Sequence, residues 1–226
     1  CACKDEFPAG HKIPLAAHVR LVFIKRKAER FQQCGNSCEF VHGNAAPRRA
    51  VVIEMRPFYT GYNTMKTVLV TGAAGFIGSN LTKILLEEGY RVVGVDNFDD
   101  TYDLRFKEAN IAPFLDNANF KLERIDIRDM DALASVFEAE KPSYAVHLAA
   151  KADTRKAVDM PRLYTSVNID GTLNFLEACR QYPVLNLVIA SSSSVYGNSS
   201  RVPFTEDEPA DRPLSPYGAT KRAVEH

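Results

Sequence analysis

Short apolar runs alternate with longer amphipathic stretches from residue 67 to the end of the chain. A short apolar run bounded by turn residues is typical of a buried strand, and apolar positions three and four apart are typical of a helix. The predicted strands cover residues 67–71, 91–96, 120–125, 144–148 and 186–191, and the predicted helices cover 76–88, 130–139, 166–181 and a segment beginning near Pro216. This order predicts repeated βαβ units with right-handed crossovers. We therefore expect an α/β fold with a doubly wound parallel sheet of the Rossmann type.

The first 64 residues show no sustained period of either 2 or 3.6. Short apolar patches at 21–24 and 51–53 are separated by basic and Gly- or Pro-containing pieces, and the pattern changes abruptly after Met65. Residues 1–64 carry 10 Lys and Arg against 5 Asp and Glu, which leaves 18 against 23 of the 28 of each kind for residues 65–226. We expect residues 1–64 to be a poorly structured or spurious N-terminal extension, Met65 to be the natural start, and residues 65–226 to form the folded domain.

Composition excludes several classes of function. Hydrophobic residues make up 46% and charged residues 25% of the chain, as in ordinary globular proteins. The formal net charge is zero, so no overall basic field recruits nucleic acid. The longest apolar runs reach about half of the roughly 20 residues that a membrane span needs, and no signal peptide is visible. We expect a cytoplasmic protein that binds neither nucleic acid nor membrane.

Four of the five cysteines, Cys1, Cys3, Cys34 and Cys38, lie in the N-terminal extension, and Cys179 alone lies in the domain. One cysteine in a helical pattern fits a reducing compartment without a disulfide framework. With His42, the cysteines of the extension offer an alternative interpretation as a zinc module that binds nucleic acid. Their spacing fits no zinc-finger pattern, so the sequence predicts no metal site.

A glycine-rich segment, Gly72-Ala-Ala-Gly75-Phe-Ile-Gly78, joins the first predicted strand to the first predicted helix. A side chain at Gly72 would block a tight turn, and one at Gly75 would hold a pyrophosphate away from the backbone. Gly78 allows helix and sheet to approach closely. The N-terminus of the following helix supplies N–H donors and a partial positive charge for phosphates. The segment therefore predicts a dinucleotide-binding turn.

An acidic residue, Asp96, ends the second predicted strand. An acid about 20 residues beyond the glycines accepts hydrogen bonds from both ribose hydroxyls and repels a 2'-phosphate. Its neighbour Asn97 is neutral, and no Arg follows immediately. The predicted cofactor is therefore NAD rather than NADP.

The segment Tyr217-Gly-Ala-Thr-Lys221 places a phenol and an ammonium group four residues apart in the last predicted helix. Positions i and i+4 share one helix face, so both groups point at the same spot. A nearby cation favours phenolate, and we expect Lys221 to lower the pKa of Tyr217 toward a value useful for proton abstraction. A serine run, Ser191–Ser194, follows the fifth predicted strand, at the sheet edge where sites of open α/β folds gather.

These motifs together resemble the extended short-chain dehydrogenase/reductase family, in the NAD-dependent epimerase/dehydratase group. Thr71–Gly78 looks like its fingerprint, which includes Phe76 and Ile77, and Val195-Tyr196-Gly197 aligns its active-site hydroxyl with Ser192. The resemblance implies that Ser192 holds the reacting sugar oxygen, that Tyr217 and Lys221 also contact the cofactor, and that Lys221 binds its nicotinamide ribose. It further implies that the cofactor is contacted by Asp126, Ile127, Leu148, Ala149 and Ala150. His147 is interpreted as a buried, satisfied histidine.

Within this family, residues 67–226 are most similar to UDP-glucuronate 4-epimerases and related UDP-sugar epimerases. Family dehydratases carry an Asp-Glu pair where this chain has Ser193 and Ser194, which favours epimerisation through transient oxidation at C4 and makes these serines candidate substrate-binding residues. Arg155 matches an Arg near the substrate in such enzymes and could pair with a carboxylate or diphosphate. The chain departs from the glucuronate enzymes at Lys151-Ala-Asp-Thr154, where they read Gln-Ala-Gly-Val.

The resemblance also implies a substrate lobe beyond His226, so we expect this chain alone to be inactive. A homodimer through helices of this domain is implied as well. Two alternatives stay open at this point: a dehydratase or reductase of the same family, and an NAD-binding module without catalysis.

Overall fold

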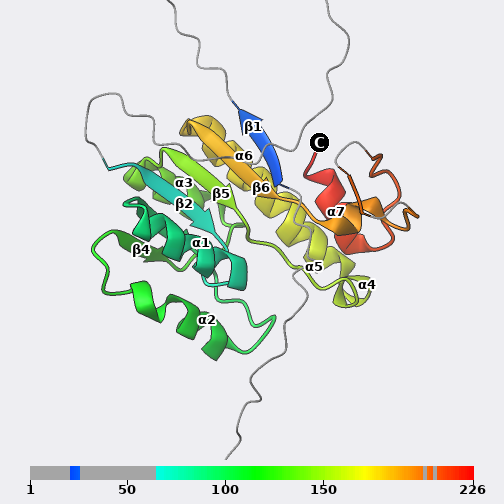
Figure 1. Ribbon diagram of the computed structural model, residues 1–226, viewed down its shortest axis with the longest axis horizontal. Coiled ribbons are helices and arrows are strands. Elements are labelled where there is room, and N and C mark those ends of the chain that lie inside the picture. The colour runs from blue at the N-terminus through cyan, green and yellow to red at the C-terminus, as the bar shows by residue number, and fades with distance from the viewer. Residues whose placement is uncertain (1–20, 26–64, 201–202, 206–207) are drawn as a thin grey trace, which may run out of the picture.

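The computed structural model describes residues 21–25, 65–200, 203–205 and 208–226. Apart from residues 21–25, the predictions for the N-terminal extension, including its candidate zinc ligands, lie outside the described residues. Within the described part, the chain folds around one six-stranded sheet with helices on both faces (Figure 1).

Five strands of the sheet are parallel, which confirms the predicted doubly wound α/β fold. They are β2 (Thr67–Thr71), β3 (Arg91–Val95), β4 (Phe120–Glu123), β5 (Tyr144–His147) and β6 (Asn186–Ala190). Across the sheet, the strands lie in the order β1-β6-β5-β2-β3-β4. The prediction did not include β1 (Leu21–Lys25), which pairs antiparallel with β6 at the edge. Such an added antiparallel edge strand is common on parallel sheets.

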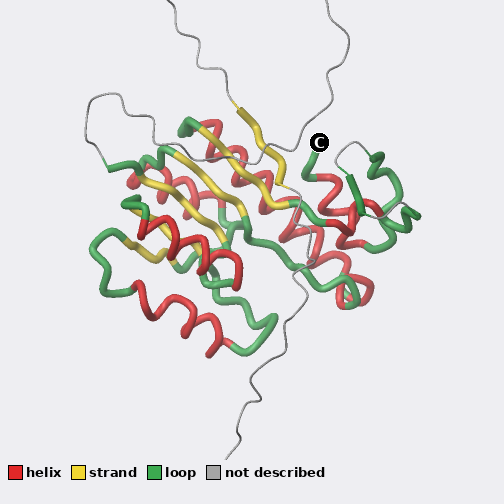
Figure 2. Tube along the Cα trace, in the orientation of Figure 1, coloured by secondary structure: helices red, strands yellow, loops and turns green. Residues whose placement is uncertain are grey.

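Register brings the carboxyl ends of the central strands together. Thr71, the last residue of β2, is level with Val95 of β3 on one side and with His147 of β5 on the other. The loops that follow these three strands therefore leave the sheet side by side, which is where ligands bind in open α/β sheets. Figure 2 shows these loops at one end of the strands.

The strands bury both faces, as expected of continuous apolar runs. In β2, Val68 and Val70 pack under α1 (Phe76–Glu87) and the 3-10 turn Ala112–Phe114 that follows α2 (Leu104–Ile111). Leu69 faces the other side and joins α3 (Met130–Glu140) and α6 (Gly171–Gln181) through Phe137 and Phe175. Figure 1 shows α1 and α2 on the near side of the sheet and α3 and α6 behind it.

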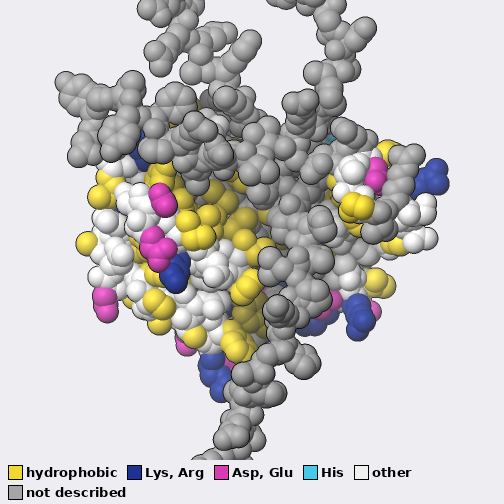
Figure 3. Space-filling view, in the orientation of Figure 1, with side chains coloured by type: hydrophobic (Ala, Val, Ile, Leu, Met, Phe, Trp, Pro, Cys, Tyr) yellow, Lys and Arg dark blue, Asp and Glu magenta, His cyan; other side chains and the backbone are white. Residues whose placement is uncertain are grey.

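The remaining helices lie beside the carboxyl edge. They are α4 (Lys156–Asp159), α5 (Pro161–Thr165), the π turn Ser166–Asp170 that leads into α6, the 3-10 turn Ser193–Tyr196, and α7 (Pro216–Ala223). The predicted ends of the five parallel strands and of the first two helices differ from the observed ones by two residues or fewer. The third predicted helix, 166–181, corresponds to the π turn Ser166–Asp170 followed by α6, and helical structure already begins at Pro161. The pattern did not reveal α2, because apolar residues such as Leu104 and Phe106 are exposed on it instead of forming a buried stripe. Figure 3 shows how prominent hydrophobic side chains are over α1, where Phe76, Ile77 and Ile84 are exposed.

Candidate active site

The glycine-rich segment forms a tight turn between β2 and α1. Gly72 has a φ of +70°, which favours glycine, and a Cβ there would lie 2.9 Å from the backbone N of Ala149. A Cβ on Gly78 would lie 2.1 Å from the carbonyl oxygen of Gly72, so only glycine lets α1 pack against the turn. Gly75 is the N-cap of α1, and no side chain caps the helix there. The turn is thus a cradle for an anion, with the N-terminus of a 12-residue helix directed at it.

A cavity of about 260 Å³ lies between this turn and the loops that follow β3, β4 and β5. Most of the predicted cofactor residues line it: Gly72, Gly75, Asp96, Asn97, Asp126, Ile127, Leu148, Ala149 and Ala150. Phe76, Ile77 and Gly78 do not belong to its lining, and the Phe76 side chain is 75% exposed. Residues that the sequence did not single out also line the cavity, among them Thr101, Tyr102, Lys107 and Val167.

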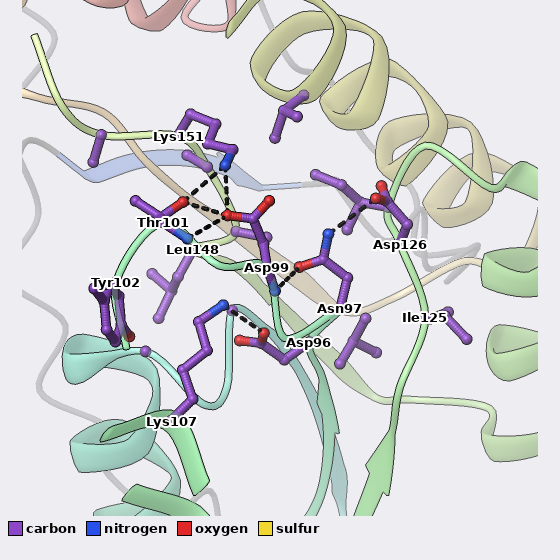
Figure 4. A pocket seen from close by; sticks show the side chains of 18 of the residues that line it. Asp96, Asn97, Asp99, Thr101, Tyr102, Lys107, Ile125, Asp126, Leu148 and Lys151 are labelled. Carbon is purple, nitrogen blue, oxygen red and sulfur yellow. Dashed lines mark hydrogen bonds and ion pairs between the residues drawn. The ribbon is translucent and has the colours of Figure 1, made fainter. Parts of the chain in front are cut away.

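Asp96 is buried and already well bonded. Its carboxylate accepts hydrogen bonds from Ala74 N at 3.1 Å and from Phe98 N at 2.8 Å. It also accepts one from Lys107 Nζ at 3.1 Å (Figure 4). A carboxylate offers about four acceptor positions, so roughly one is left for a ribose hydroxyl rather than the two expected. Lys107 comes from α2 and neutralises the acid, which weakens the charge argument against a 2'-phosphate. Sequence reasoning missed this lysine because it missed α2, although Asp103 before Leu104 is an N-cap signal.

Asp126 forms the far wall of the cavity, after β4. It accepts from Asn97 Nδ2 at 2.9 Å and from Arg128 Nη2 at 2.7 Å. The hydrogen bonds from Arg128 lower the pKa of Asp126 to about 2. Asn97 and Asp126, which the sequence analysis named separately, are therefore joined directly, which fixes the loops after β3 and β4 relative to each other (Figure 4).

A buried polar chain connects the glycine-rich turn to the catalytic helix. Thr71 Oγ1 accepts from the N–H groups of Leu148 and Ala149, so we assign its own hydrogen to His147 Nδ1 at 2.8 Å. His147 Nε2 then donates to Thr172 Oγ1 at 3.0 Å, and Thr172 donates to the carbonyl of Asn168. His147 is 1% exposed and stacks on Phe175, and burial lowers its pKa to about 3. This confirms its interpretation as a satisfied, neutral core histidine.

Asn168, within the π turn, extends this chain to α7. Its Oδ1 accepts from Lys151 N at 2.8 Å, and its Nδ2 donates to the Lys151 carbonyl at 3.0 Å and to Thr220 Oγ1 at 2.9 Å. Thr220 in turn donates to the carbonyl of Tyr217. The cavity lining and the helix that carries Tyr217 are therefore held together by one side-chain amide.

Ser192, Tyr217 and Lys221 meet beyond the carboxyl end of β6. Pro216 occupies the first turn of α7, and the Ser215 side chain caps the helix by accepting from Gly218 N at 3.0 Å. Tyr217 is 7% exposed, and the Ser192 side chain lies near enough to lower the pKa of its phenol. Lys221 is 5% exposed and donates from Nζ to the Ala190 carbonyl at 3.1 Å. The structure thus brings the three predicted catalytic residues to one place, although none of them lines the 260 Å³ cavity.

The pKa values of this group correct one expectation. Burial raises the pKa of Tyr217, and the Ser192 hydrogen bond opposes that rise. The predicted lowering by Lys221 is not found, because the ammonium group is directed at the Ala190 carbonyl and burial lowers the pKa of Lys221 itself to about 8. Ser192, not Lys221, is the side chain that favours the phenolate here.

The serine run turns back against α7. Ser192 Oγ accepts from Ser194 N at 3.2 Å, and Ser193 and Ser194 are half-buried in the 3-10 turn. A Cβ on Gly218 would lie 2.7 Å from the Ser194 carbonyl, so the glycine after Tyr217 permits this contact. Arg155, the predicted substrate residue, is exposed at the start of α4.

None of the helices in the described ranges has the length and hydropathy of a membrane span. The same residues contain no group of three or more His, Cys, Asp or Glu side chains placed to hold a metal ion.

Fold and site together place the chain in the class of dinucleotide-binding α/β domains and give it a Ser–Tyr–Lys group at the end of β6. Comparison with known proteins agrees: residues 69–226 match the family described as GDP-mannose 4,6 dehydratase. UDP-glucuronate 4-epimerase from Thermodesulfobacterium geofontis (strain OPF15) is 46% identical over 157 residues, which cover 70% of this chain and 48% of that protein. UDP-glucuronate 4-epimerase 4 from Arabidopsis thaliana is 42% identical over 167 residues, covering 74% and 38%.

Solved structures give the same result. UDP-glucuronic acid 4-epimerase from Bacillus cereus, in complex with UDP-glucuronic acid and NAD, has a TM-score of 0.65 and 39% identity, covering 71% of this chain and 50% of that one. UDP-glucose 4-epimerase from Brucella ovis, in complex with NAD, has a TM-score of 0.63 and 35% identity, covering 71% and 46%. The chain belongs to the NAD-dependent epimerase/dehydratase family, as the sequence resemblance indicated. It spans about half the length of the relatives it matches.

Proposed function

We propose that this chain is the NAD-binding and catalytic part of a UDP-sugar 4-epimerase. The observation that carries the proposal is that Ser192 acts on Tyr217, which lies one helical turn before Lys221 on α7, in a domain whose glycine-rich turn forms a cradle for an anion. The relatives and structural neighbours named above, which are called UDP-sugar 4-epimerases, support it.

The residues present fit NAD. The turn from Gly72 to Gly78 leaves room where a Cβ would block a phosphate, and the uncapped N-terminus of α1 offers N–H donors for the diphosphate. Asp96 and Lys107 are placed to bind a ribose, and Asp126 and Ile127 to flank the adenine. When bound, NAD supplies a hydride acceptor for the sugar carbon C4 and returns the hydride to the opposite face.

Tyr217 is assigned the proton of the sugar 4-hydroxyl. Its phenolate removes that proton as the alcohol becomes a ketone, and its phenol returns the proton when the alcohol forms again. Because burial raises the pKa of Tyr217, the phenolate needs support from its neighbours. Ser192 supplies that support. Lys221, with a pKa of about 8, keeps its positive charge at neutral pH and is assigned to the nicotinamide ribose.

The absence of an acid beside Ser192 favours epimerisation over dehydration. Eliminating water needs a general acid and base next to the sugar, and Ser193 and Ser194 are neutral hydroxyl groups. They are assigned to hydrogen-bond the substrate instead. Arg155 is the candidate partner of a sugar carboxylate or the nucleotide diphosphate, since its guanidinium can bind either in bidentate fashion.

The test uses the protein at the full length of its relatives, incubated with catalytic NAD and a panel of UDP-sugars, with C4 epimers resolved by chromatography. Interconversion of a glucose-type and a galactose-type pair is the expected result. A 4-keto or decarboxylated sugar in place of an epimer would support the dehydratase branch of the family and overturn the roles of Ser193 and Ser194.

The chemistry of the domain also supports a reducing compartment, for which we propose the cytoplasm. Cys179 is a buried free thiol whose pKa burial raises to about 12, so it is inert toward disulfide exchange. The homodimer that the resemblance implies remains a proposal, which light scattering on the full-length protein tests.

A further inference from the structure

An ion pair joins the two loops on either side of the glycine-rich turn. Lys151, in the loop after β5, donates from Nζ to Asp99 Oδ1 at 2.5 Å and to Thr101 Oγ1 at 2.8 Å, both in the loop after β3. Since β2 lies between β3 and β5, this contact crosses the space in front of the turn (Figure 4). All three residues line the cavity.

Both sides of the contact are held by further hydrogen bonds. The backbone of Lys151 is fixed in both directions by the Asn168 side chain. On the other side, Thr101 N donates to Asp99 Oδ1 at 2.9 Å, and Asp99 N donates to Asn97 Oδ1 at 3.0 Å. The contact therefore connects two anchored loops rather than two free side chains.

The ion pair is partly shielded from solvent, with side-chain exposures of 12% for Lys151 and 28% for Asp99. Burial by itself would raise the pKa of Asp99, but the hydrogen bonds from Lys151 and Thr101 outweigh it and the pKa is lowered. Removal of one partner of such a shielded pair leaves the charge of the other uncompensated.

We infer that Lys151 and Asp99 act as a clasp that closes over the diphosphate of the bound dinucleotide and slows its release. The inference rests on the proposed NAD binding and adds a positioning role for two residues outside the Ser192–Tyr217–Lys221 group. The competing role for Lys151 is direct attraction of the diphosphate by its charge. The two roles predict opposite effects of removing the Asp99 carboxylate. A clasp needs the carboxylate, so its loss speeds the release of NAD. Direct attraction becomes stronger when the carboxylate no longer competes for the ammonium group, so its loss slows the release of NAD.

The test is a double-mutant cycle on the 226-residue chain with Lys151→Gln, Asp99→Asn and both together, read as the NAD dissociation rate by stopped-flow fluorescence. Each single variant is expected to release NAD about tenfold faster, and the double variant no faster than the singles, because affinity changes of this kind lie mostly in dissociation. Lys83→Gln is the control, since it removes the same charge from an exposed position on α1 that does not line the cavity, and less than a twofold change is expected. Slower release from Asp99→Asn, or effects that multiply in the double variant, would overturn the clasp.

A second measurement needs no cofactor. Hydrogen exchange of the cofactor-free chain is expected to quicken at the amides of Asp99 and Thr101 in both single variants, equally in the double variant, and not at the amides of β2 or β3. Wild-type protein that fails to bind NAD would overturn the proposed function and the clasp with it. Wild-type protein that binds NAD, with variants that release it at the wild-type rate, would overturn the clasp alone.

Discussion

The cofactor side and the catalytic side of the site are built differently. The cofactor side surrounds β2 in the middle of the sheet, where loops after three parallel strands enclose one cavity. The catalytic side lies at β6, the last of the parallel strands, and its three residues lie outside that cavity. The two groups of residues can therefore be compared by substitutions that touch one group and not the other.

Charge is handled differently on the two sides as well. Asp96 on the cofactor side is buried together with a matching cation, Lys107, so the pair is neutral. Lys221 on the catalytic side is buried against a carbonyl group, and its pKa falls. A cation held in this way is poorly compensated, which costs stability but leaves its charge available to an oxyanion nearby. The cofactor side is thus built for stability and the catalytic side for reactivity.

The largest expected effect is a loss of turnover from a substitution on the catalytic side alone. Tyr217→Phe removes the proton carrier and keeps the ring, so turnover in the full-length protein should fall by about 10² to 10⁴-fold. NAD affinity should change less than about twofold, because Tyr217 does not line the cavity. Epimerase assays and NAD titration on the same variant measure both. Undiminished turnover would contradict the assignment of Tyr217, and a large loss of NAD affinity would contradict the separation of the two sides.

Glycine substitutions on the two sides should differ in how much they lower the free energy of unfolding. Gly78→Ala places a Cβ 2.1 Å from the Gly72 carbonyl oxygen in the centre of the fold, whereas Gly218→Ala places one 2.7 Å from the Ser194 carbonyl oxygen at its edge. We expect the free energy of unfolding to drop by more than about 3 kcal/mol for the first and by about 1–2 kcal/mol for the second. Urea titration measures both.

Gly89→Ala is the control for these substitutions. No atom lies within 4 Å of its Cβ, so only its φ of +81° penalises the change, by about 1 kcal/mol. Equal losses from Gly78→Ala and Gly218→Ala would mean that the centre and the edge of the sheet tolerate crowding alike.

The fold and the cofactor side were largely predictable because their signals are local. A strand such as 67–71 is a continuous apolar run buried on both faces, and the turn depends on glycines that adjoin it in sequence. The spacing of Tyr217 and Lys221 needs only one helix. These features do not depend on which distant residue they meet.

The rest depends on contacts between distant segments, which no window of sequence contains. Lys107 reaches Asp96 from a helix with weak amphipathic character, and Lys151 reaches Asp99 across 52 residues. The pKa of Tyr217 was mispredicted for the same reason: the i, i+4 spacing gives the direction of Lys221, but the Ala190 carbonyl and the surrounding burial decide what the ammonium group does.

The two sides should also respond to opposite ends of the pH range. His147 has a pKa of about 3 in the fold against 6.5 unfolded, so the unfolded chain binds the additional proton as pH falls. Stability from this group is complete above pH 6.5 and should fall by about 2–3 kcal/mol between pH 6.5 and 4.5. His147→Gln should flatten that slope in urea titrations made at each pH. An unchanged slope would show that other groups cause the acid sensitivity.

Lys221 gives the alkaline counterpart. Its pKa is about 8 in the fold against 10.5 unfolded, so the folded chain loses the proton first and stability should rise with pH between 8 and 10.5. Lys221→Met removes the buried charge and should abolish this rise. The free energy of unfolding at pH 7 should increase by on the order of 1–2 kcal/mol, and activity should be lost. If the variant is less stable at pH 7, the ammonium group is better compensated than its single hydrogen bond to Ala190 indicates.

The smallest expected effects come from the helix caps, which exist in matching form on both sides. The Asp103 side chain caps α2, which carries Lys107, and the Ser215 side chain caps α7, which carries Tyr217 and Lys221. Changing either residue to Ala should lower the free energy of unfolding by about 1 kcal/mol, since each change removes one capping hydrogen bond.

The two substitutions should differ in the function that is lost. Asp103→Ala loosens the helix beneath the ribose site and should weaken NAD binding severalfold. Ser215→Ala should leave NAD affinity unchanged and lower turnover. Calorimetry with NAD and epimerase assays on the full-length protein separate the two outcomes. If both variants lose NAD affinity equally, α7 supports the cofactor as much as α2 does. The change would then be transmitted by the buried chain of hydrogen bonds that runs from Thr71 through His147, Thr172 and Asn168 to Thr220.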